Sequence, residues 1–247
     1  MGLSRRRGVS CGVMDGWQRV YGKVAIMKKM MVCLLLLMVL AASGCQTARP
    51  YGEGGGKVAL WNGEDFSGWK LFIPDADVDA KDVWSVRDGV IHCTGKPNGY
   101  MRTTAEYANY HLHLEWRWPG KPTNSGVLLH VALPDQVWPK CIESQLMSGQ
   151  AGDFWILSHA GITANGERYE DPNNKYVHVK KRHETSENPP GQWNVYDIYC
   201  EGDTVRSVVN GVEQNHGTKA TPASGYIALQ SEGSPIEFRN IHIVPLK

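Results

Sequence analysis

Apolar and polar residues alternate with a period of two along most of the chain from Val83 onward. In His111–Trp118 the apolar positions Leu112, Leu114 and Trp116 alternate with imidazole and charged side chains. Since successive side chains of a strand point to opposite faces, this pattern predicts a strand with one buried and one exposed face. Similar patterns predict strands at residues 84–93, 126–131, 140–147, 193–201, 205–209, 226–230 and 236–244.

Turn motifs separate these predicted strands. Asn210-Gly211 lies between two apolar segments and predicts a two-residue hairpin turn, and Asp88-Gly89 predicts a second turn. Many short strands joined by such turns are typical of an all-β sandwich or barrel. The polar stretch at residues 165–191 lacks the alternation, so we expect a long loop there at the rim of a sheet.

The N-terminal part of the chain has the pattern of an export signal. Basic residues directly after Met27 precede an apolar run, residues 30–42, which ends in Ala-Ser-Gly-Cys45. A basic region, an apolar run and small residues before the cleavage site are typical of a secretory signal, and this ending resembles a bacterial lipobox. The run of about 13 residues is shorter than the roughly 20 that span a bilayer, which disfavours a transmembrane anchor.

We therefore expect translation to begin at Met27, residues 1–45 to form a leader with a lipoprotein signal peptide, and Cys45 to carry lipid. Residues 46–57 are Gly-rich and polar, and they predict a flexible tether to one domain at residues 58–247. The protein is then expected to be an exported cell-envelope lipoprotein on the periplasmic or outer-membrane side. It would contact the membrane only through its N-terminal lipid.

Loss of the leader changes the charge balance of the chain. Residues 1–45 hold 7 of the 26 Lys and Arg residues and 1 of the 25 Asp and Glu residues. The remaining 19 basic and 24 acidic residues give a net charge of about −5. A mildly acidic protein has no electrostatic footprint for nucleic acid, so we expect no nucleic-acid partner.

The cysteines leave two interpretations open. Cys11 and Cys33 lie in the expected leader, so the domain holds Cys93, Cys141 and Cys200. An exported compartment permits one disulfide among them. Each also lies in an apolar, strand-like segment, which favours buried free thiols. No Cys-x-x-Cys or His-x-x-x-His spacing predicts a metal site.

Six short motifs follow one another along residues 58–246. They are Trp61-Asn-Gly-Glu-Asp-Phe-Ser-Gly-Trp69, Asn124-Ser-Gly126, Glu143-Ser-Gln145, Gly152-Asp-Phe154, Gly191-Gln-Trp-Asn194 and Ser231-Glu-Gly-Ser-Pro-Ile-Glu-Phe-Arg-Asn-Ile-His-Ile243. In order and spacing they resemble the 3-keto-disaccharide hydrolase family. The resemblance implies a concanavalin A-like jelly-roll β-sandwich whose polar sheet face binds an oligosaccharide or 3-keto-glycoside substrate.

Glu143 and Gln145 are the strongest candidates for chemistry. They are two residues apart on a predicted strand and therefore point to the same face. By itself this spacing is typical of a solvent-exposed face, but the match to the Glu-x-Gln motif of the family favours a site. Glu143 is then a general base or a ligand of a bound cation, and Gln145 contacts the substrate. A divalent cation that stabilises negative charge is compatible with these residues.

The strand before this pair supplies a second group. Gly126, Leu128 and His130 are expected to share one face, and Asn124 is expected either to form a turn or to bond a sugar hydroxyl. His130 stands where the family pattern often carries Arg. It is expected either to be a structural histidine or, beside Glu143, to be a second catalytic acid or base.

The remaining candidate substrate contacts are Glu115, Arg117, Asp153, Trp155, Asn194 and Gln230. Glu115 and Arg117 belong to a charged row that lies either on an outer face or in the site. Asp153 and Trp155 follow glycines that would let a loop fold over the site. Asn194 and Gln230 are implied by the family motifs.

These residues predict an enzyme that acts on sugars oxidised to a ketone at C3. The ketone acidifies the C2 proton, so a base can remove it and expel the C1 substituent, after which water adds. Motifs of serine hydrolases, P-loop proteins, dinucleotide-binding proteins and zinc proteases are absent. The alternative is a non-catalytic, lectin-like carbohydrate-binding lipoprotein, because fold alone does not settle function.

Overall fold

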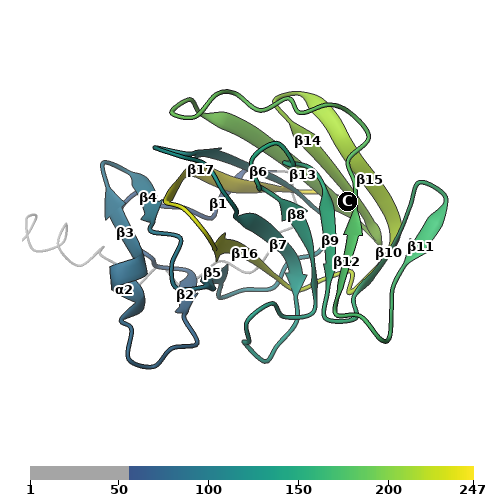
Figure 1. Cartoon of the computed structure of the whole chain (residues 1–247), viewed down its shortest axis with the longest axis horizontal. Coiled ribbons are helices and arrows are strands. Elements are labelled where there is room, and N and C mark those ends of the chain that lie inside the picture. Colours follow the sequence, from purple (N-terminus) through teal and green to yellow (C-terminus); the bar gives the residue numbers. More distant parts are fainter. Residues whose placement is uncertain (1–55) are drawn as a thin grey trace, which may run out of the picture. The chain divides into compact units, whose positions relative to one another are not determined.

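The computed structural model describes residues 56–247, which form two antiparallel β-sheets packed face to face (Figure 1). The ten-stranded sheet has the order β11 (Glu167–Tyr169), β10 (Gly161–Ala164), β15 (Val212–Thr221), β14 (Thr204–Val209), β13 (Asn194–Glu201), β6 (Tyr110–Arg117), β17 (Ile236–Pro245), β4 (Val90–Cys93) and β3 (Trp84–Arg87), with β1 (Val58–Ala59) beside β17. The seven-stranded sheet has the order β12 (Tyr176–Val179), β9 (Phe154–Leu157), β8 (Cys141–Gln145), β7 (Gly126–Val131), β16 (Tyr226–Ser231), β5 (Gly99–Thr103) and β2 (Trp69–Phe72). One short helix, α2 (Ala80–Val83), precedes β3. The predicted all-β sandwich is confirmed.

The main core lies between the two sheets, and the alternation in the sequence explains which side chains fill it. In β6, Leu112, Leu114 and Trp116 are fully buried, whereas the intervening polar residues are half-buried. Val127 and Leu129 on β7 enter the same core from the other sheet. The two predicted turns have the left-handed backbone that Asn-Gly and Asp-Gly favour, with φ of 48° at Asn210 and 50° at Asp88.

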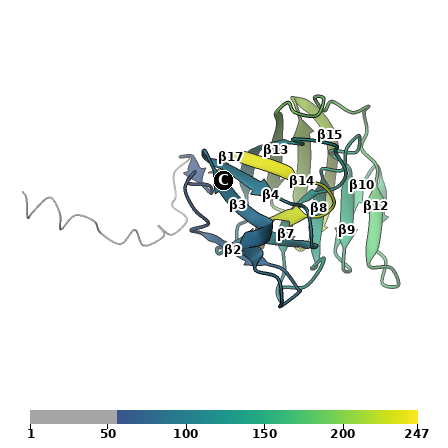
Figure 2. The same ribbon diagram turned by 60° about the vertical axis from the view of Figure 1, so that its left-hand side comes forward.

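The predicted long loop at residues 165–191 is wrong in part, because it contains β11 and β12. Each is the edge strand of its sheet, paired to only one neighbour. Edge strands of this kind carry polar and charged residues, so they lack the strong alternation of a buried strand. Figure 2 shows β12 beside β9 at one edge of the fold, away from β2 and β3.

The other face of the seven-stranded sheet carries a smaller apolar cluster, which includes Tyr100, Leu128 and Leu157. We call this the outer face of the seven-stranded sheet. The segment at residues 132–140, between β7 and β8, packs on it through Trp138. This face is therefore partly covered and not simply exposed to solvent.

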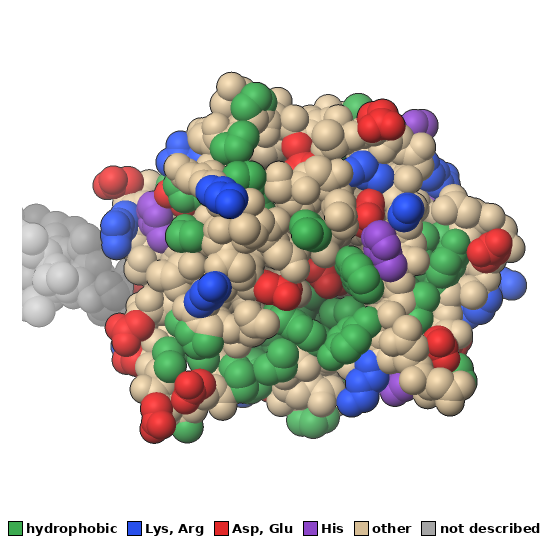
Figure 3. All heavy atoms as spheres, viewed as in Figure 1, with side chains coloured by type: hydrophobic (Ala, Val, Ile, Leu, Met, Phe, Trp, Pro, Cys, Tyr) green, Lys and Arg blue, Asp and Glu red, His purple; other side chains and the backbone are tan. Residues whose placement is uncertain are grey.

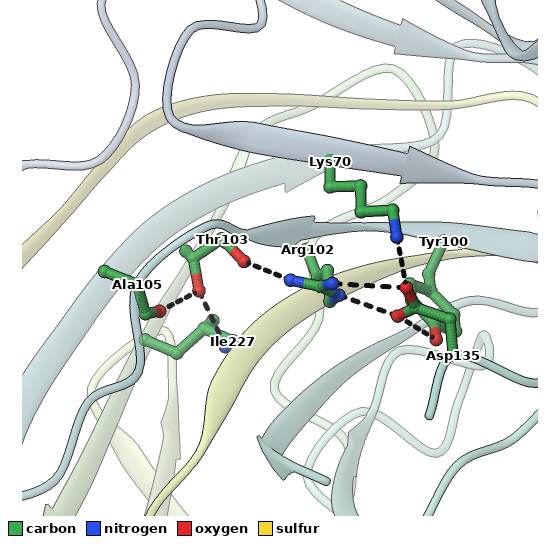
Figure 4. A network of polar contacts seen from close by, with 7 residues as sticks. All are labelled: Lys70, Tyr100, Arg102, Thr103, Ala105, Asp135 and Ile227. Carbon is green, nitrogen blue, oxygen red and sulfur yellow. Dashed lines mark hydrogen bonds and ion pairs between the residues drawn. The ribbon is translucent and has the colours of Figure 1, made fainter. Parts of the chain in front are cut away.

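An ion-pair network fixes that segment to the sheet (Figure 4). Asp135 accepts hydrogen bonds from Arg102 Nε at 2.7 Å, Lys70 Nζ at 2.7 Å and the Tyr100 hydroxyl at 2.9 Å. Burial alone would raise the pKa of Asp135, but these three donors outweigh it and hold the pKa well below its ordinary value. The 132–140 segment is thus anchored at Asp135, close to Trp138.

The predicted lipoprotein leader, the start at Met27, the lipid site at Cys45 and most of the tether lie outside the described residues. Within residues 56–247, none of the helices is both long enough and apolar enough to cross a membrane.

We predict that Asp135→Asn lowers the free energy of unfolding by about 3 kcal/mol at neutral pH, because it leaves the buried Arg102 guanidinium without its counter-charge. The folded-state pKa of Asp135 is lowered, so its contribution is present above the unfolded pKa and is lost as the pH falls toward the folded pKa. Chemical denaturation at pH 7 and pH 3 measures both effects. The matched variant Glu106→Gln, at an exposed position, should change little; an equal loss there would contradict the assignment.

Candidate active site

A pocket of about 440 Å³ opens on the outer face of the seven-stranded sheet. Its lining residues come from four strands and the loops beside them: Asn124, Trp138, Glu143, Gln145, Met147, Trp155, Leu157, Tyr176, Gln230 and Glu232. Figure 3 shows hydrophobic side chains gathered beside acidic ones over this part of the surface. The volume lies in the range of small-molecule sites.

Glu143 lies on β8, between the lining residues of β9 and those of β16. It stands opposite Leu128 on β7 and Trp155 on β9, so both neighbours point to the same face as Glu143. A Cβ atom on Gly126 would lie 2.1 Å from Glu143 Oε1, so only glycine leaves room for the carboxyl group. Glu143 is 4% exposed, and its Oε1 has no hydrogen-bond partner.

Two effects raise the pKa of Glu143 well above its ordinary value. Burial is the larger cause, and the charge of Glu232 adds to it, while a hydrogen bond from Gln230 partly opposes both. The pKa of Glu232 is also raised by burial, and a hydrogen bond with Asn124 partly opposes that shift. Among the described lining residues there is no Lys, Arg or His that could neutralise this pair of carboxyl groups.

Amide groups surround the carboxyl pair. Gln145 Oε1 accepts the backbone N–H groups of Leu146 and Met147, both at 2.8 Å, which leaves its NH2 group to face the pocket. Asn124 Oδ1 and Gln230 Oε1 are buried without a hydrogen-bond partner. The site therefore offers one amide donor and several free acceptors, a set that suits hydroxyl groups.

Asp153 and Trp155 have different roles. Trp155 lines the pocket and stacks on His178, with ring centroids 4.5 Å apart. Asp153 does not line it; the carboxylate contacts His178 Nε2 at 2.6 Å and accepts from Lys181 N at 3.0 Å. Asp153 thus fixes the imidazole that supports Trp155. Asp153 was expected in a loop that folds over the site; instead it is buried outside the pocket lining, and β9 begins at the next residue.

His130 does not share a face with Glu143, and the predicted catalytic role is wrong for this residue. β7 and β16 shift register between Leu128 and Val131, and His130 adopts a φ of 55°. This bulge turns the imidazole toward the other sheet, where it meets Tyr110 edge to face at 6.0 Å. Burial lowers the pKa of His130 to about 4, and its Nδ1 contacts the Pro222 carbonyl.

Glu115 and Arg117 lie on the far face of the ten-stranded sheet, and their predicted substrate contacts are wrong. Glu115 accepts from Arg239 Nε at 2.7 Å, and Arg117 donates to Glu237. The reason is the alternation in β6, whose apolar residues face the core and turn the charged row outward. The guanidinium groups of Arg117 and Arg239 also lie over the Trp193 ring, 4.6 Å and 4.0 Å from its centroid.

Asn194 is also structural. Its side-chain oxygen accepts from Asn188 N at 2.7 Å and from Asn210 Nδ2 at 2.8 Å, which ties the loop before β13 to the β14–β15 turn. It belongs to the ten-stranded sheet and is not among the pocket residues. The predicted substrate contact is wrong for this residue.

Sequence reasoning missed Glu232, Trp138, Met147, Leu157 and Tyr176 as lining residues. Glu232 stands in the Ser-Glu-Gly motif and could have been recognised there. Trp138 lies in a segment without alternation, and Tyr176 lies in an edge strand, so no periodic signal marked either residue.

The three cysteines of the described part are free and buried, which agrees with the thiol interpretation. Residues 56–247 contain no group of three or more His, Cys, Asp and Glu side chains placed to hold a metal ion. The pocket oxygens of Asn124, Gln230 and the two carboxyl groups are of the kind that Mg²⁺ or Ca²⁺ accepts. A bound divalent cation therefore stays a prediction.

Comparisons with known proteins agree with this architecture. A family model described as 3-keto-alpha-glucoside-1,2-lyase-like domain matches residues 56–244. No curated protein sequence matches the chain.

Solved structures share the fold. Two proteins of Parabacteroides distasonis, each assigned as a glycosyl hydrolase, are 24% identical; the matches cover 78% and 74% of this chain and 94% and 96% of theirs, with TM-scores of 0.58 and 0.54. A β-glucanase of Bacillus licheniformis is 11% identical over 79% of this chain and 99% of its own, with a TM-score of 0.50. The predicted concanavalin A-like jelly roll is confirmed.

We predict that Glu143→Gln stabilises the folded protein at pH 8 by about 1–3 kcal/mol, because it removes a buried carboxylate that has no cation beside it. The folded-state pKa of Glu143 is raised, so wild-type stability falls as the pH rises from the unfolded pKa through the folded one. The variant should lack this part of the slope. Thermal unfolding from pH 4 to pH 9 measures it, and a loss of stability at pH 8 would contradict the electrostatic assignment.

Proposed function

Since the chain belongs to the family of 3-keto-alpha-glucoside-1,2-lyase-like domains, we propose that it cleaves glycosides whose sugar ring carries a ketone at C3. Family membership makes it a carbohydrate-active, glycosidase-like protein. The observation that carries the proposal is the carboxyl group of Glu143. It is buried in the pocket, and no Lys, Arg or His among the described lining residues neutralises it.

The reaction needs only a base, an acid and a binding site for a ketone. A C3 ketone makes the C2 proton acidic, because the electrons left on C2 delocalise onto the ketone oxygen. A base removes that proton, a double bond forms between C1 and C2, and the C1–O bond breaks. The departing oxygen takes up a proton. Water that later adds to the double bond gives the free 3-keto sugar.

Glu143 is the residue that we assign as the base. Its raised pKa makes it a stronger base than an ordinary glutamate, and a base is most effective when its pKa approaches the working pH. Glu232 lies near enough to raise that pKa and is the candidate acid for the departing oxygen. Glu143 would take the proton from C2 and pass it to Glu232, and Glu232 would give it to the departing oxygen.

The amide groups are assigned to binding and to stabilising charge. We assign the Gln145 NH2 group to donate to the oxygen that becomes negative as C2 is deprotonated, since its Oε1 is already occupied by two backbone N–H groups. The unpartnered oxygens of Asn124 and Gln230 would accept hydrogen bonds from sugar hydroxyl groups. An oxidoreductase must supply the substrate, because nothing in this reaction forms the ketone.

We predict that Glu143→Gln lowers kcat for a 3-keto glycoside by about 10²–10⁴-fold, since the amide cannot accept the C2 proton. In the wild type, kcat/KM should rise with pH as Glu143 ionises, with an inflection above the ordinary pKa of glutamate, and should fall again as Glu232 loses the proton that it donates. Release of the C1 substituent from pH 4 to pH 9 measures both.

The controls separate this function from simple sugar binding. Glu115→Gln changes a carboxyl group on the other sheet and should leave kcat within twofold of wild type. The unoxidised parent glycoside should not react. Full activity in Glu143→Gln would contradict the assigned base. Tight binding of the unoxidised glycan, with no release from any 3-keto glycoside, would instead identify a non-catalytic carbohydrate-binding protein.

A further inference from the structure

Apart from Met147, which lies two residues beyond Gln145 at the polar end, the lining of the pocket changes from polar to apolar along the strand direction. Gln145 on β8 is level with Gly126 on β7, and Asn124 lies two residues before that glycine. Gln230 is two residues beyond Ala228, the partner of Leu128, so it is also level with Gly126. We call Asn124, Gln145, Gln230 and Glu232 the polar half of the pocket.

The apolar half begins on the other side of Glu143. Leu157 pairs with Cys141, two residues from Glu143, and Tyr176 pairs with Leu157. Two residues of a strand span about 7 Å, so these side chains lie one step along the sheet from the carboxyl group. Trp138 lies at the same end, since its carbonyl accepts from Ser158 Oγ at 2.7 Å. We call Trp138, Trp155, Leu157 and Tyr176 the apolar half of the pocket.

We infer that the polar half holds a single 3-keto sugar ring, and that the apolar half receives an apolar aglycone, aromatic or aliphatic, in preference to a second sugar. This inference rests on the proposed function, because it assigns the two halves to the two sides of the bond that breaks. With the C1–C2 bond over Glu143, the C1 substituent extends toward Trp138 and Tyr176.

Hydrogen-bonding capacity decides between the two kinds of leaving group. A second sugar would place several hydroxyl groups against the apolar half, and those that face the sheet would leave water without a side-chain partner. Apart from two indole N–H groups and one phenol, the apolar half offers no polar side-chain atoms. A phenyl or alkyl group needs no such partner and gains from leaving water.

The surroundings of the apolar half support the same occupant. Tyr176 is 44% exposed, and Leu133 and Val137, in the same segment as Trp138, are 51% and 38% exposed. Exposed apolar side chains beside a pocket are typical of a binding surface. The Asp135 network holds this segment against the sheet, so the apolar wall is formed before a ligand binds.

The test compares substrates that share the 3-keto sugar and the anomeric configuration and differ in the C1 substituent: benzyl, methyl, or a second glucose. Benzyl alcohol and methanol have similar acidities, and a sugar hydroxyl is somewhat more acidic, so leaving-group chemistry does not favour the benzyl compound. We expect kcat/KM for the benzyl compound to exceed both others by at least about tenfold.

The matched variants are Tyr176→Ala and Tyr176→Phe, at a position exposed enough to tolerate change. Tyr176→Ala should lower kcat/KM for the benzyl compound about tenfold, mainly through KM, and should lower it much less for the methyl compound. Tyr176→Phe should keep the preference. Equal or better use of the disaccharide, or an equal loss on benzyl and methyl compounds in Tyr176→Ala, would overturn the inference.

A binding measurement separates failure of this inference from failure of the proposed function. Quenching of tryptophan fluorescence reports binding of unoxidised benzyl glucoside and of the matched disaccharide, with no turnover required. Tighter binding of the benzyl compound that is lost in Tyr176→Ala supports an apolar subsite even if no 3-keto glycoside reacts. Tighter binding of the disaccharide overturns the subsite even if Glu143-dependent elimination is found.

Discussion

The carboxyl group of Glu143 lies within the face of the seven-stranded sheet, in space that Gly126 leaves free on the neighbouring strand. A Cβ atom at position 126 would lie 2.1 Å from Glu143 Oε1. The burial of this carboxyl group, which is the main cause of its raised pKa, therefore depends on the glycine. Two neighbours act on this carboxyl group. Gln230 donates a hydrogen bond to it, which lowers its pKa, and the charge of Glu232 raises its pKa.

Alternation turns polar side chains outward in both sheets, but the two outward rows have different partners. On the outward side of the ten-stranded sheet, residues of β17 neutralise the charges of β6. Glu115 pairs with Arg239, and Arg117 pairs with Glu237. In the seven-stranded sheet the outward row of β8 is left without a cation and is enclosed by the 132–140 segment and the aromatic residues of β9 and β12. The charged residues of β6 are therefore paired within their sheet, whereas the carboxyl group on β8 has no Lys, Arg or His among the described pocket residues.

The sequence predicted the all-β sandwich and the shared face of Glu143 and Gln145, because a period of two is a local property of each strand. It did not predict the bulge at His130, since the left-handed backbone there depends on the register between β7 and β16. The sequence also could not predict that Glu115 and Asn194 lie away from the pocket. Alternation shows which side chains share a face, but it does not show which of the two sheets a strand joins. Tyr176 was missed because it lies in an edge strand, and edge strands often lack the apolar and polar alternation that marks a buried strand.

The three free thiols are divided between the sheets: Cys93 and Cys200 lie in the ten-stranded sheet, and Cys141 lies beneath the pocket in the other. Burial raises the pKa of Cys93 to about 11 and that of Cys200 to about 12, and it raises the pKa of Cys141 as well. All three are therefore unreactive while the strands around them are paired. The three thiols can therefore report local opening of the fold. Alkylation of Cys141 would show that the sheet around the pocket has opened, and alkylation of Cys93 or Cys200 would show that the core beside the ten-stranded sheet has opened.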